Sequence, residues 1–124
     1  MATKISTNNA PAAIGPYSQA MVVGNMVFTS GQIAINPASG NIEAQDVVGQ
    51  TEQVMKNLGA VLAAAGSSFE KAVKNTCFLA DIADFAAFNE VYGKYFTEKP
   101  ARSCVAAKAL PKGALVEVEV IAEI

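Results

Sequence analysis

Histidine is absent from this chain of 124 residues, and its absence restricts the possible chemistry more than any other feature of the composition. Without histidine there is no Ser-His-Asp or Cys-His pair to activate a nucleophile. The commonest metal ligand and the usual general base are missing as well. Any catalysis must therefore rely on Glu, Asp, Arg, Cys, Tyr or backbone groups.

Charged residues are also scarce, at 16% of the chain, whereas hydrophobic residues make up 52% and the mean hydropathy is +0.29. No charged residue occurs from Ile5 to Ile42, but turn formers and amides interrupt that region, so it cannot form a membrane-spanning helix. A domain of this size must leave much of its surface outside. The surplus of apolar residues therefore predicts a homo-oligomer that buries part of this surface between copies.

Only two cysteines are present, Cys77 and Cys104, and they are not at a metal-ligand spacing. The N-terminal residues lack the apolar core of a secretory signal, so we expect reduced thiols and a cytoplasmic location. The net charge of −2 and the pI of about 5.0 give no broad attraction to nucleic acid or to an anionic membrane. The length favours one domain spanning residues 1–124.

Apolar periodicity in the first half of the chain predicts a hairpin followed by a helix. Gly24-Asn25 tolerate positive φ and separate two apolar runs, which is typical of a tight β-hairpin. Over about residues 46–65 apolar side chains recur every three or four positions, as expected for a helix that lies on a sheet. The other face of this helix carries Gln50, Gln53, Lys56 and Asn57.

The second half predicts the remaining elements of a two-layer α+β domain. Residues 73–80 are β-branched and aromatic enough for a buried strand. Asp81 is a suitable N-cap for a second helix with an aromatic face, and residues 100–124 predict a terminal hairpin. The order ββ(β)αβαββ favours one mixed sheet with both helices on one face.

The terminal segment contains the strongest candidates for chemistry. Arg102 and Cys104 stand two residues apart, so in a strand they point to the same side. The planar fork of arginine suits bidentate capture of a carboxylate, and a surface ion pair with Glu117 or Glu119 is the alternative. A hairpin that turned near residues 110–114 would place Glu117 beside Arg102, where the two could bind an anion and orient a water. A one-residue slip in register would reverse that arrangement.

Other candidates are weaker on their residue types alone. Cys104 fits a small buried hydrophobe better than a nucleophile. Tyr17 follows Gly15-Pro16 in a rigid loop, which suits a fixed hydroxyl or a packed ring. Ser30-Gly31-Gln32 interrupt an apolar strand, where glycine either admits a ligand or marks a bulge. Asn89, on the second helix, needs a partner if it is buried.

Four segments in order along the chain, NAPAAIGPYSQA, FTSGQI, DFAAFNEVY and PARSCVA…LPKGALVEVEVIA, together resemble the RidA family of reactive intermediate deaminases. The resemblance covers essentially the whole chain. It implies a chorismate-mutase-like α+β fold assembled as a homotrimer, with clefts between neighbouring subunits. It also implies hydrolysis of imine and enamine acids such as 2-aminoacrylate and 2-aminocrotonate to 2-keto acids and ammonia, with no metal or cofactor.

The same resemblance assigns roles to individual residues. Arg102 matches the arginine that holds the substrate carboxylate, and Glu117 matches the acidic residue that positions the attacking water. Because the implied cleft lies between subunits, Arg102 and Tyr17 of one site can belong to different chains. The cleft-lining positions are Tyr17, Ser30, Gly31, Asn89 and Cys104, with backbone groups expected from Gly31 and Cys104.

Two alternative functions remain open on the sequence. A regulatory trimer could use the same cleft to bind 2-keto acids without turnover, linked to branched-chain amino-acid metabolism, and an intact Arg102 fits both functions. A ribonuclease or translation inhibitor ranks last, since RNA cleavage calls for basic grooves, stacking aromatics and an acid–base pair. An acidic chain without histidine offers none of these clearly.

Overall fold

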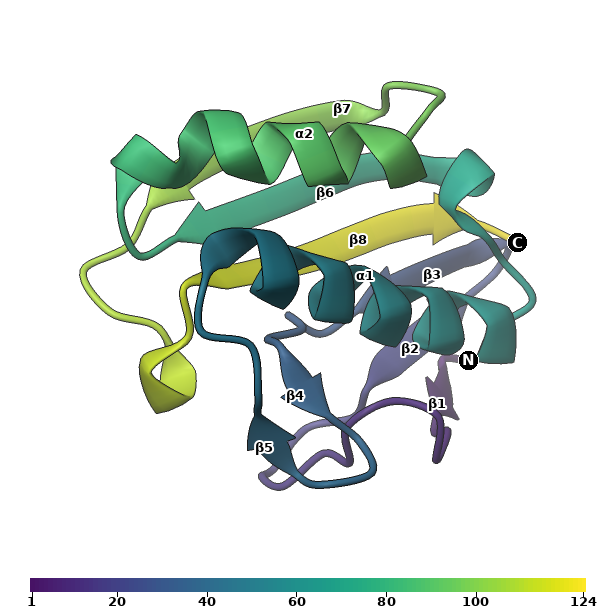
Figure 1. Cartoon of the computed structure of the whole chain (residues 1–124). Coiled ribbons are helices and arrows are strands. Elements are labelled where there is room, and N and C mark those ends of the chain that lie inside the picture. Colours follow the sequence, from purple (N-terminus) through teal and green to yellow (C-terminus); the bar gives the residue numbers. More distant parts are fainter.

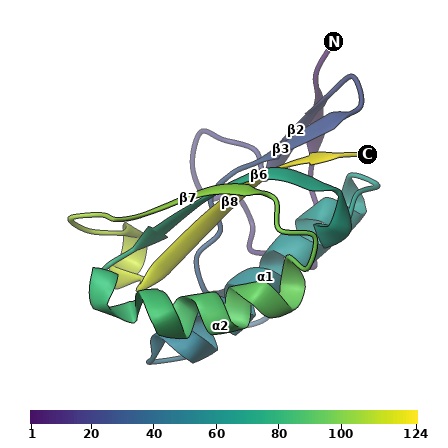
Figure 2. The same ribbon diagram turned by 90° about the horizontal axis from the view of Figure 1, so that it is seen from above.

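The computed structural model describes residues 1–124, and its main feature is one mixed sheet with two α-helices on one face (Figures 1 and 2). The helices are α1 (Val47–Ala64) and α2 (Phe85–Tyr95), and the strands are β1 (Thr3–Ile5), β2 (Ala20–Val23), β3 (Met26–Thr29), β4 (Ile35–Asn36), β5 (Asn41–Ile42), β6 (Ala72–Leu79), β7 (Ala101–Ala106) and β8 (Val116–Glu123). The six-stranded sheet has the order β1-β2-β3-β8-β6-β7, and β4 and β5 form a separate small hairpin. The α+β class predicted from the sequence is confirmed.

The last two strands do not pair with each other. β6 and β7 run parallel, with Asn75 beside Arg102 and Cys77 beside Cys104. β8 lies between β3 and β6 and is antiparallel to both. α2 provides the crossover that a parallel strand pair requires. The predicted terminal hairpin of residues 100–124 is therefore wrong, because β6 separates its two strands.

One face of β8 supplies much of the core beneath the helices. Val116 and Val118 are fully buried and belong to the same apolar cluster as Leu58 of α1. Each such aliphatic side chain contributes about 1.5–3 kcal/mol of hydrophobic stabilisation. Because side chains alternate along a strand, Glu117 and Glu119 lie on the opposite face of the sheet.

α1 begins and ends close to the predicted residues. The side chain of Asp46 accepts a hydrogen bond from the backbone N–H of Gly49 at 2.8 Å, which caps the first turn. Gly66 follows the helix with a φ of +81°, a left-handed conformation that glycine adopts without steric cost. The boundaries of this helix could therefore be read from its capping residues.

The predicted polar face of α1 is partly buried, which the sequence did not indicate. Asn57 is fully buried, and its Nδ2 donates to the backbone carbonyls of Ile33 at 3.0 Å and Ile35 at 2.9 Å. Gln50 is also buried and accepts a hydrogen bond from the backbone N–H of Leu115 at 2.9 Å. These amides tie α1 to neighbouring segments, and the segment containing Ile33 and Ile35, which leads into β4, borders a cavity.

The face of the sheet opposite the helices has no covering layer within the chain, as Figure 2 shows. Alternation along the strands places Val23, Phe28 and Val105 on this face, where they are 48%, 42% and 48% exposed. In-register neighbours extend the apolar surface, with Ile121 beside Phe28 and Phe78 beside Val105. An uncovered apolar sheet face of this kind is typical of a surface that associates with another protein chain.

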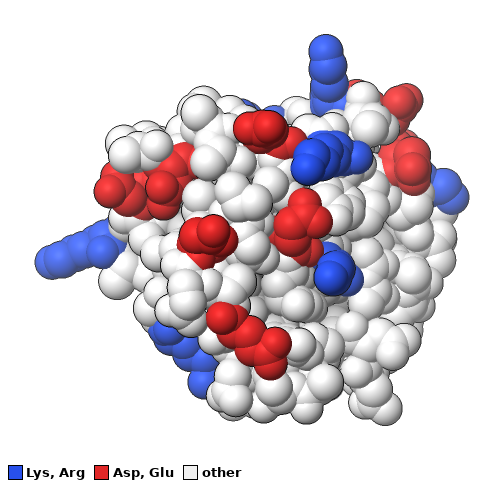
Figure 3. All heavy atoms as spheres, viewed as in Figure 1, with Lys and Arg blue, Asp and Glu red and all other residues white.

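Charge on the helix-bearing side is mixed in sign. Figure 3 shows acidic and basic side chains interspersed over this side, without a continuous basic patch.

Neither α-helix combines the length with the apolar character that crossing a membrane would require.

Replacing Asn57 with Ala should lower the free energy of unfolding by about 2–4 kcal/mol, because two backbone carbonyls lose their donors inside the fold. Urea denaturation followed by circular dichroism, at one fixed protein concentration, measures the change. Lys56→Ala is the matched control: Lys56 is exposed on the same helix, and its loss should change stability by less than about 0.5 kcal/mol. Equal effects of the two substitutions would contradict a clamping role for Asn57.

Candidate functional site

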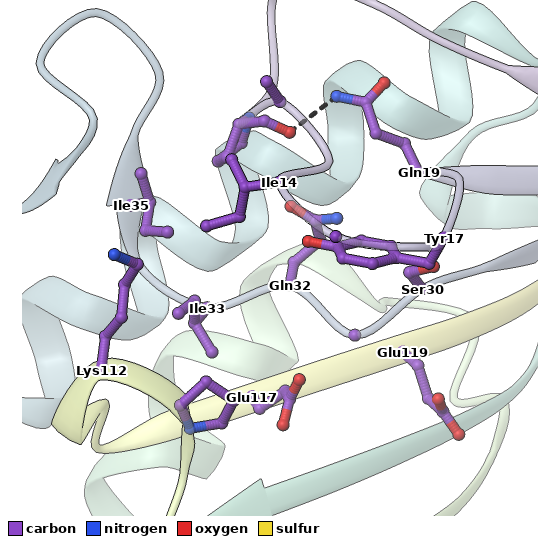
Figure 4. Close-up of a pocket in the computed structure, with 15 residues that line it drawn as sticks. Ile14, Tyr17, Gln19, Ser30, Gln32, Ile33, Ile35, Lys112, Glu117 and Glu119 are labelled. Atoms are coloured by element: carbon purple, nitrogen blue, oxygen red, sulfur yellow. Dashed lines mark hydrogen bonds between the residues drawn. The ribbon is translucent and has the colours of Figure 1, made fainter.

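A cavity of about 550 Å³ opens on the face of the sheet that the helices leave uncovered (Figure 4). Its walls come from the loop of residues 11–19, the segment of residues 30–35, the turn at residues 111–112 and the outward face of β8. Four of the residues singled out from the sequence line it: Tyr17, Ser30, Gly31 and Glu117.

The loop that carries Tyr17 is held in place by buried Gln19. The side chain of Gln19 accepts a hydrogen bond from the backbone N–H of Thr7 at 2.7 Å and donates to the carbonyl of Pro11 at 2.7 Å. Ser30 adds a second tie, since its hydroxyl donates to the carbonyl of Ser18 at 2.5 Å. The half-exposed ring of Tyr17 is therefore presented at the cavity by a braced loop.

Glu117 occupies space that a side chain at Gly31 would take. A β-carbon at residue 31 would lie 2.9 Å from the carboxyl carbon of Glu117, and closer still to its Oε2, well inside van der Waals contact. The neighbouring Gln32 pairs with Val118 through two backbone hydrogen bonds of 2.9 and 3.1 Å, which draws this segment against β8. The glycine thus admits a carboxylate of the same chain close to the backbone.

The environment of Glu117 alters its acidity. Partial burial raises the pKa of Glu117 above its ordinary value, and the negative charge of Glu119 raises it further. Figure 4 shows both carboxylates extending from β8, with Lys112 reaching in from the turn that precedes this strand. A carboxylate with a raised pKa is better matched to proton transfer near neutral pH than an ordinary one.

Arg102, Asn89 and Cys104 do not line this cavity. Arg102 is in register with buried Asn75 of β6, on the face of the sheet that the helices cover. Its Nη1 donates to Oδ1 of Asn89 on α2 at 2.5 Å. Because Glu117 lies on the other face, the hypothesis that Arg102 and Glu117 share one pocket within a chain is wrong.

Neither cysteine is prepared for nucleophilic chemistry. Burial raises the pKa of Cys77 to about 12, and neighbouring Cys104 adds to this effect while Arg102 opposes it. Burial also raises the pKa of Cys104, with Arg102 again acting in the opposite direction. Both side chains therefore remain thiols at neutral pH. No three His, Cys, Asp or Glu side chains gather closely enough to hold a metal ion.

Several residues that shape the site were not identified from the sequence. Gln19 and Gln32 are buried amides within the uncharged N-terminal region, and an amide in so apolar a stretch is the only signal that could have indicated their roles. Glu119 and Lys112 carried no distinguishing signal, because each looks like an ordinary surface charge in its strand or turn.

Comparison with known proteins identifies a matching family and several similar proteins. Residues 7–124 match the family described as endoribonuclease L-PSP. "Putative regulator AldR" of Lactococcus lactis is 50% identical over 97% of this chain and 96% of its own length. The 2-iminobutanoate/2-iminopropanoate deaminase of Capra hircus is 50% identical over 95% of this chain and 87% of its own. The crystal structure of E. coli TdcF with bound serine has a TM-score of 0.93 and 45% identity, covering 98% of each chain.

Replacing Glu119 with Gln should lower the pKa of Glu117, because it removes the like charge and leaves the burial unchanged. Carbon-13 NMR titration of the side-chain carboxyl groups measures this pKa directly. The raised pKa in the folded state means that stability from this group is present below its ordinary value of 4.5 and is lost as the pH rises through the folded value.

The matched control for this titration is Glu123→Gln, at the exposed end of the same strand. It should leave the pKa of Glu117 unchanged, since solvent screens a charge at that distance. A pKa of Glu117 that does not fall in Glu119→Gln would show that the two carboxylates are not coupled.

Proposed function

The chain belongs to the endoribonuclease L-PSP family, which includes the RidA proteins, and from that premise we propose that it hydrolyses small 2-imino and 2-enamino acids to 2-keto acids and ammonia. Relatives named as imine deaminases at about 50% identity support this activity. The serine bound in the TdcF crystal structure supports a small ligand that bears a carboxylate.

The observation that carries the proposal is the seating of Glu117 against Gly31 in the wall of a cavity that also contains Tyr17 and Ser30. An imine carbon is already electrophilic, so its hydrolysis requires an oriented water and a weak base. A carboxylate of raised pKa supplies that base without histidine or a metal.

Arg102 completes the site only if it comes from a neighbouring copy of the chain. It lies on edge strand β7 and on the face of the sheet opposite Glu117. The uncovered apolar face containing Val23, Phe28 and Val105 offers a surface for association, and a closed ring of three copies would bring each β7 edge to a neighbour. We therefore propose that Arg102 of one subunit and Glu117 of the next meet in one intersubunit cleft of a homotrimer.

The remaining candidates divide between the two sides of this cleft. Tyr17, Ser30 and Gly31 accompany Glu117, since all four line the same cavity. Asn89 accompanies Arg102, to which it is hydrogen-bonded. Cys104 contributes backbone groups from β7, because an edge strand leaves N–H and C=O groups without a strand partner.

The chemistry proceeds in two balanced steps. Arg102 binds the substrate carboxylate through its guanidinium fork, which orients the C=N bond. Glu117 takes a proton from water as the oxygen attacks the imine carbon and passes it to the nitrogen, giving a carbinolamine in which carbon bears both OH and NH₂. Glu117 then takes the hydroxyl proton and delivers it to the nitrogen as the C–N bond breaks, which releases ammonia, leaves the 2-keto acid and returns Glu117 to its starting state.

A regulator that binds 2-keto acids without turnover is the second candidate, favoured by the relative named "Putative regulator AldR". It would use the same guanidinium for the keto-acid carboxylate. RNA cleavage fits less well, because Glu117 and Glu119 would repel phosphate in the cavity and the surface in Figure 3 has no continuous basic patch.

Arg102→Ala should reduce kcat/KM for imine hydrolysis by about 100-fold, the effect of losing two charge-assisted hydrogen bonds worth about 3 kcal/mol. The assay follows 2-keto acid release from a serine or threonine dehydratase with and without this protein. Arg102→Lys, which retains the charge but not the fork, should lie between Ala and the native protein.

Glu117→Gln tests the other half of the site in the same assay. It should lower kcat by about 100-fold or more, as expected for loss of a general base. In the native protein kcat should rise with pH as Glu117 deprotonates, with a midpoint above the ordinary glutamate pKa of 4.5. A folded, oligomeric native protein that does not accelerate imine loss would overturn the deaminase proposal and favour the regulator.

Mixing Arg102→Ala chains with Glu117→Gln chains should restore activity that neither variant has alone. In a ring, one junction in every mixed trimer joins an intact Arg102 to an intact Glu117, and random equal mixing restores about a quarter of the sites. Co-refolding, or co-expression with two affinity tags, provides the mixed assemblies. If Arg102 and Glu117 of one chain served the same site, no mixture would recover activity.

A further inference from the structure

The guanidinium of Arg102 is surrounded by three side chains from one stripe of α2. Oδ1 of Asn89 accepts from Nη1 at 2.5 Å, and the guanidinium carbon lies 4.9 Å from the ring centroid of Tyr92 and 5.4 Å from that of Phe85. Spacings of three and four residues put these side chains on one side of the helix. We call Phe85, Asn89 and Tyr92 the α2 cradle.

We propose that the α2 cradle is a set of positioning residues that holds the guanidinium of Arg102 in the orientation that binds a ligand carboxylate. Asn75 supports the cradle through its hydrogen bond to Tyr92. This inference rests on the proposed function only in naming a carboxylate as the ligand. An arginine side chain carries about 2 kcal/mol of rotamer entropy, and holding it before binding removes that cost from the affinity.

The exposure of Phe85 is the first observation that supports the cradle. The sequence places Phe85 with the apolar residues of α2, yet it is 37% exposed while Phe88 of the same helix is fully buried. Its ring therefore does not serve the core. It lies over Arg102 instead, within the distance at which a cation is attracted to the face of an aromatic ring.

The anchoring of Tyr92 is the second observation. Tyr92 is nearly buried, and its hydroxyl accepts a hydrogen bond from Nδ2 of Asn75 at 2.8 Å. Asn75 is fully buried on β6, in register with Arg102, so it supports the ring beside the residue that the ring contacts. Burial raises the pKa of Tyr92, with the Asn75 hydrogen bond opposing this, so the phenol stays neutral near the guanidinium.

Asn75 also carries a buried, unsatisfied side-chain oxygen, which destabilises the fold and which packing alone does not explain. Its Oδ1 is the one buried side-chain oxygen or nitrogen in the chain that has no hydrogen-bond partner. Leaving such a group unpaired costs about 1–3 kcal/mol. An apolar residue at position 75 would avoid that cost, but it could not donate a hydrogen bond to the Tyr92 hydroxyl. The Tyr92 ring would then no longer be fixed in its position beside the guanidinium of Arg102.

The test compares Phe85→Leu with Phe88→Leu in the full-length oligomer. Phe85→Leu removes the ring over Arg102 and should raise KM by about 3- to 30-fold with kcat within about twofold, since it weakens ground-state and transition-state binding equally. Phe88→Leu should lower stability through the core and leave KM unchanged. Phe85→Tyr keeps a ring in place and should retain the native KM.

A second readout does not depend on turnover. Arg102 is the only arginine in the chain, so selective nitrogen-15 labelling gives one Nε–Hε signal without assignment. In the native protein this signal should be that of an immobilised side chain. In Phe85→Leu it should show increased picosecond-to-nanosecond motion, and the order parameter should fall. In Phe88→Leu it should match the native signal.

The outcomes distinguish failure of the cradle proposal from failure of the deaminase proposal. If the native protein does not turn over imines, calorimetric binding of 2-ketobutyrate replaces KM, and a weakened affinity in Phe85→Leu alone still supports the cradle. An Arg102 signal that is equally ordered in Phe85→Leu and the native protein, whatever the turnover, would overturn the cradle. So would an increase in KM that Phe88→Leu matches, because the effect would then be general destabilisation.

Discussion

The insertion of β8 between β3 and β6 is the constraint on which the rest of the structure depends. Its valines are buried beneath α1 and α2, which leaves no freedom in the direction of the residues between them. Glu117 and Glu119 must therefore face the uncovered side of the sheet. A one-residue shift of β8 would bury both carboxylates in the core, a cost far beyond the marginal stability of a domain.

The same constraint separates the two charged groups of the proposed site. Glu117 belongs to the uncovered face, whereas Arg102 extends from edge strand β7 toward α2 on the covered face. In the proposed trimer each chain would hold two incomplete half-sites. Association through the uncovered apolar face would join them, so oligomerisation and activity would depend on the same surface.

Both half-sites are held by residues that need not touch a ligand. Gln19 braces the loop that carries Tyr17, and Gly31 leaves the space that Glu117 occupies. On the other side, α2 surrounds the guanidinium of Arg102. In the proposed site, which has no histidine, such preparation would matter because orientation would then account for much of the rate.

The sequence by itself determined α1 and the two faces of β8: the capped helix after Asp46, and the alternation that directs Val118 inward and Glu117 outward. These are local properties, since capping and periodicity depend on neighbours along the chain. Tertiary structure alone decided which elements meet. Alternation states which face of a strand is buried but not which strand lies beside it, so the terminal hairpin was wrong. Helical periodicity likewise states on which side of a helix a residue lies, but not which other segment packs against that side. Buried Asn57 was therefore interpreted as part of the polar face of its helix. The contacts of Arg102 with α2 depended both on strand pairing and on helix placement. The crossover through α2 set β7 beside β6 and brought the aromatic side chains of this helix against an edge strand.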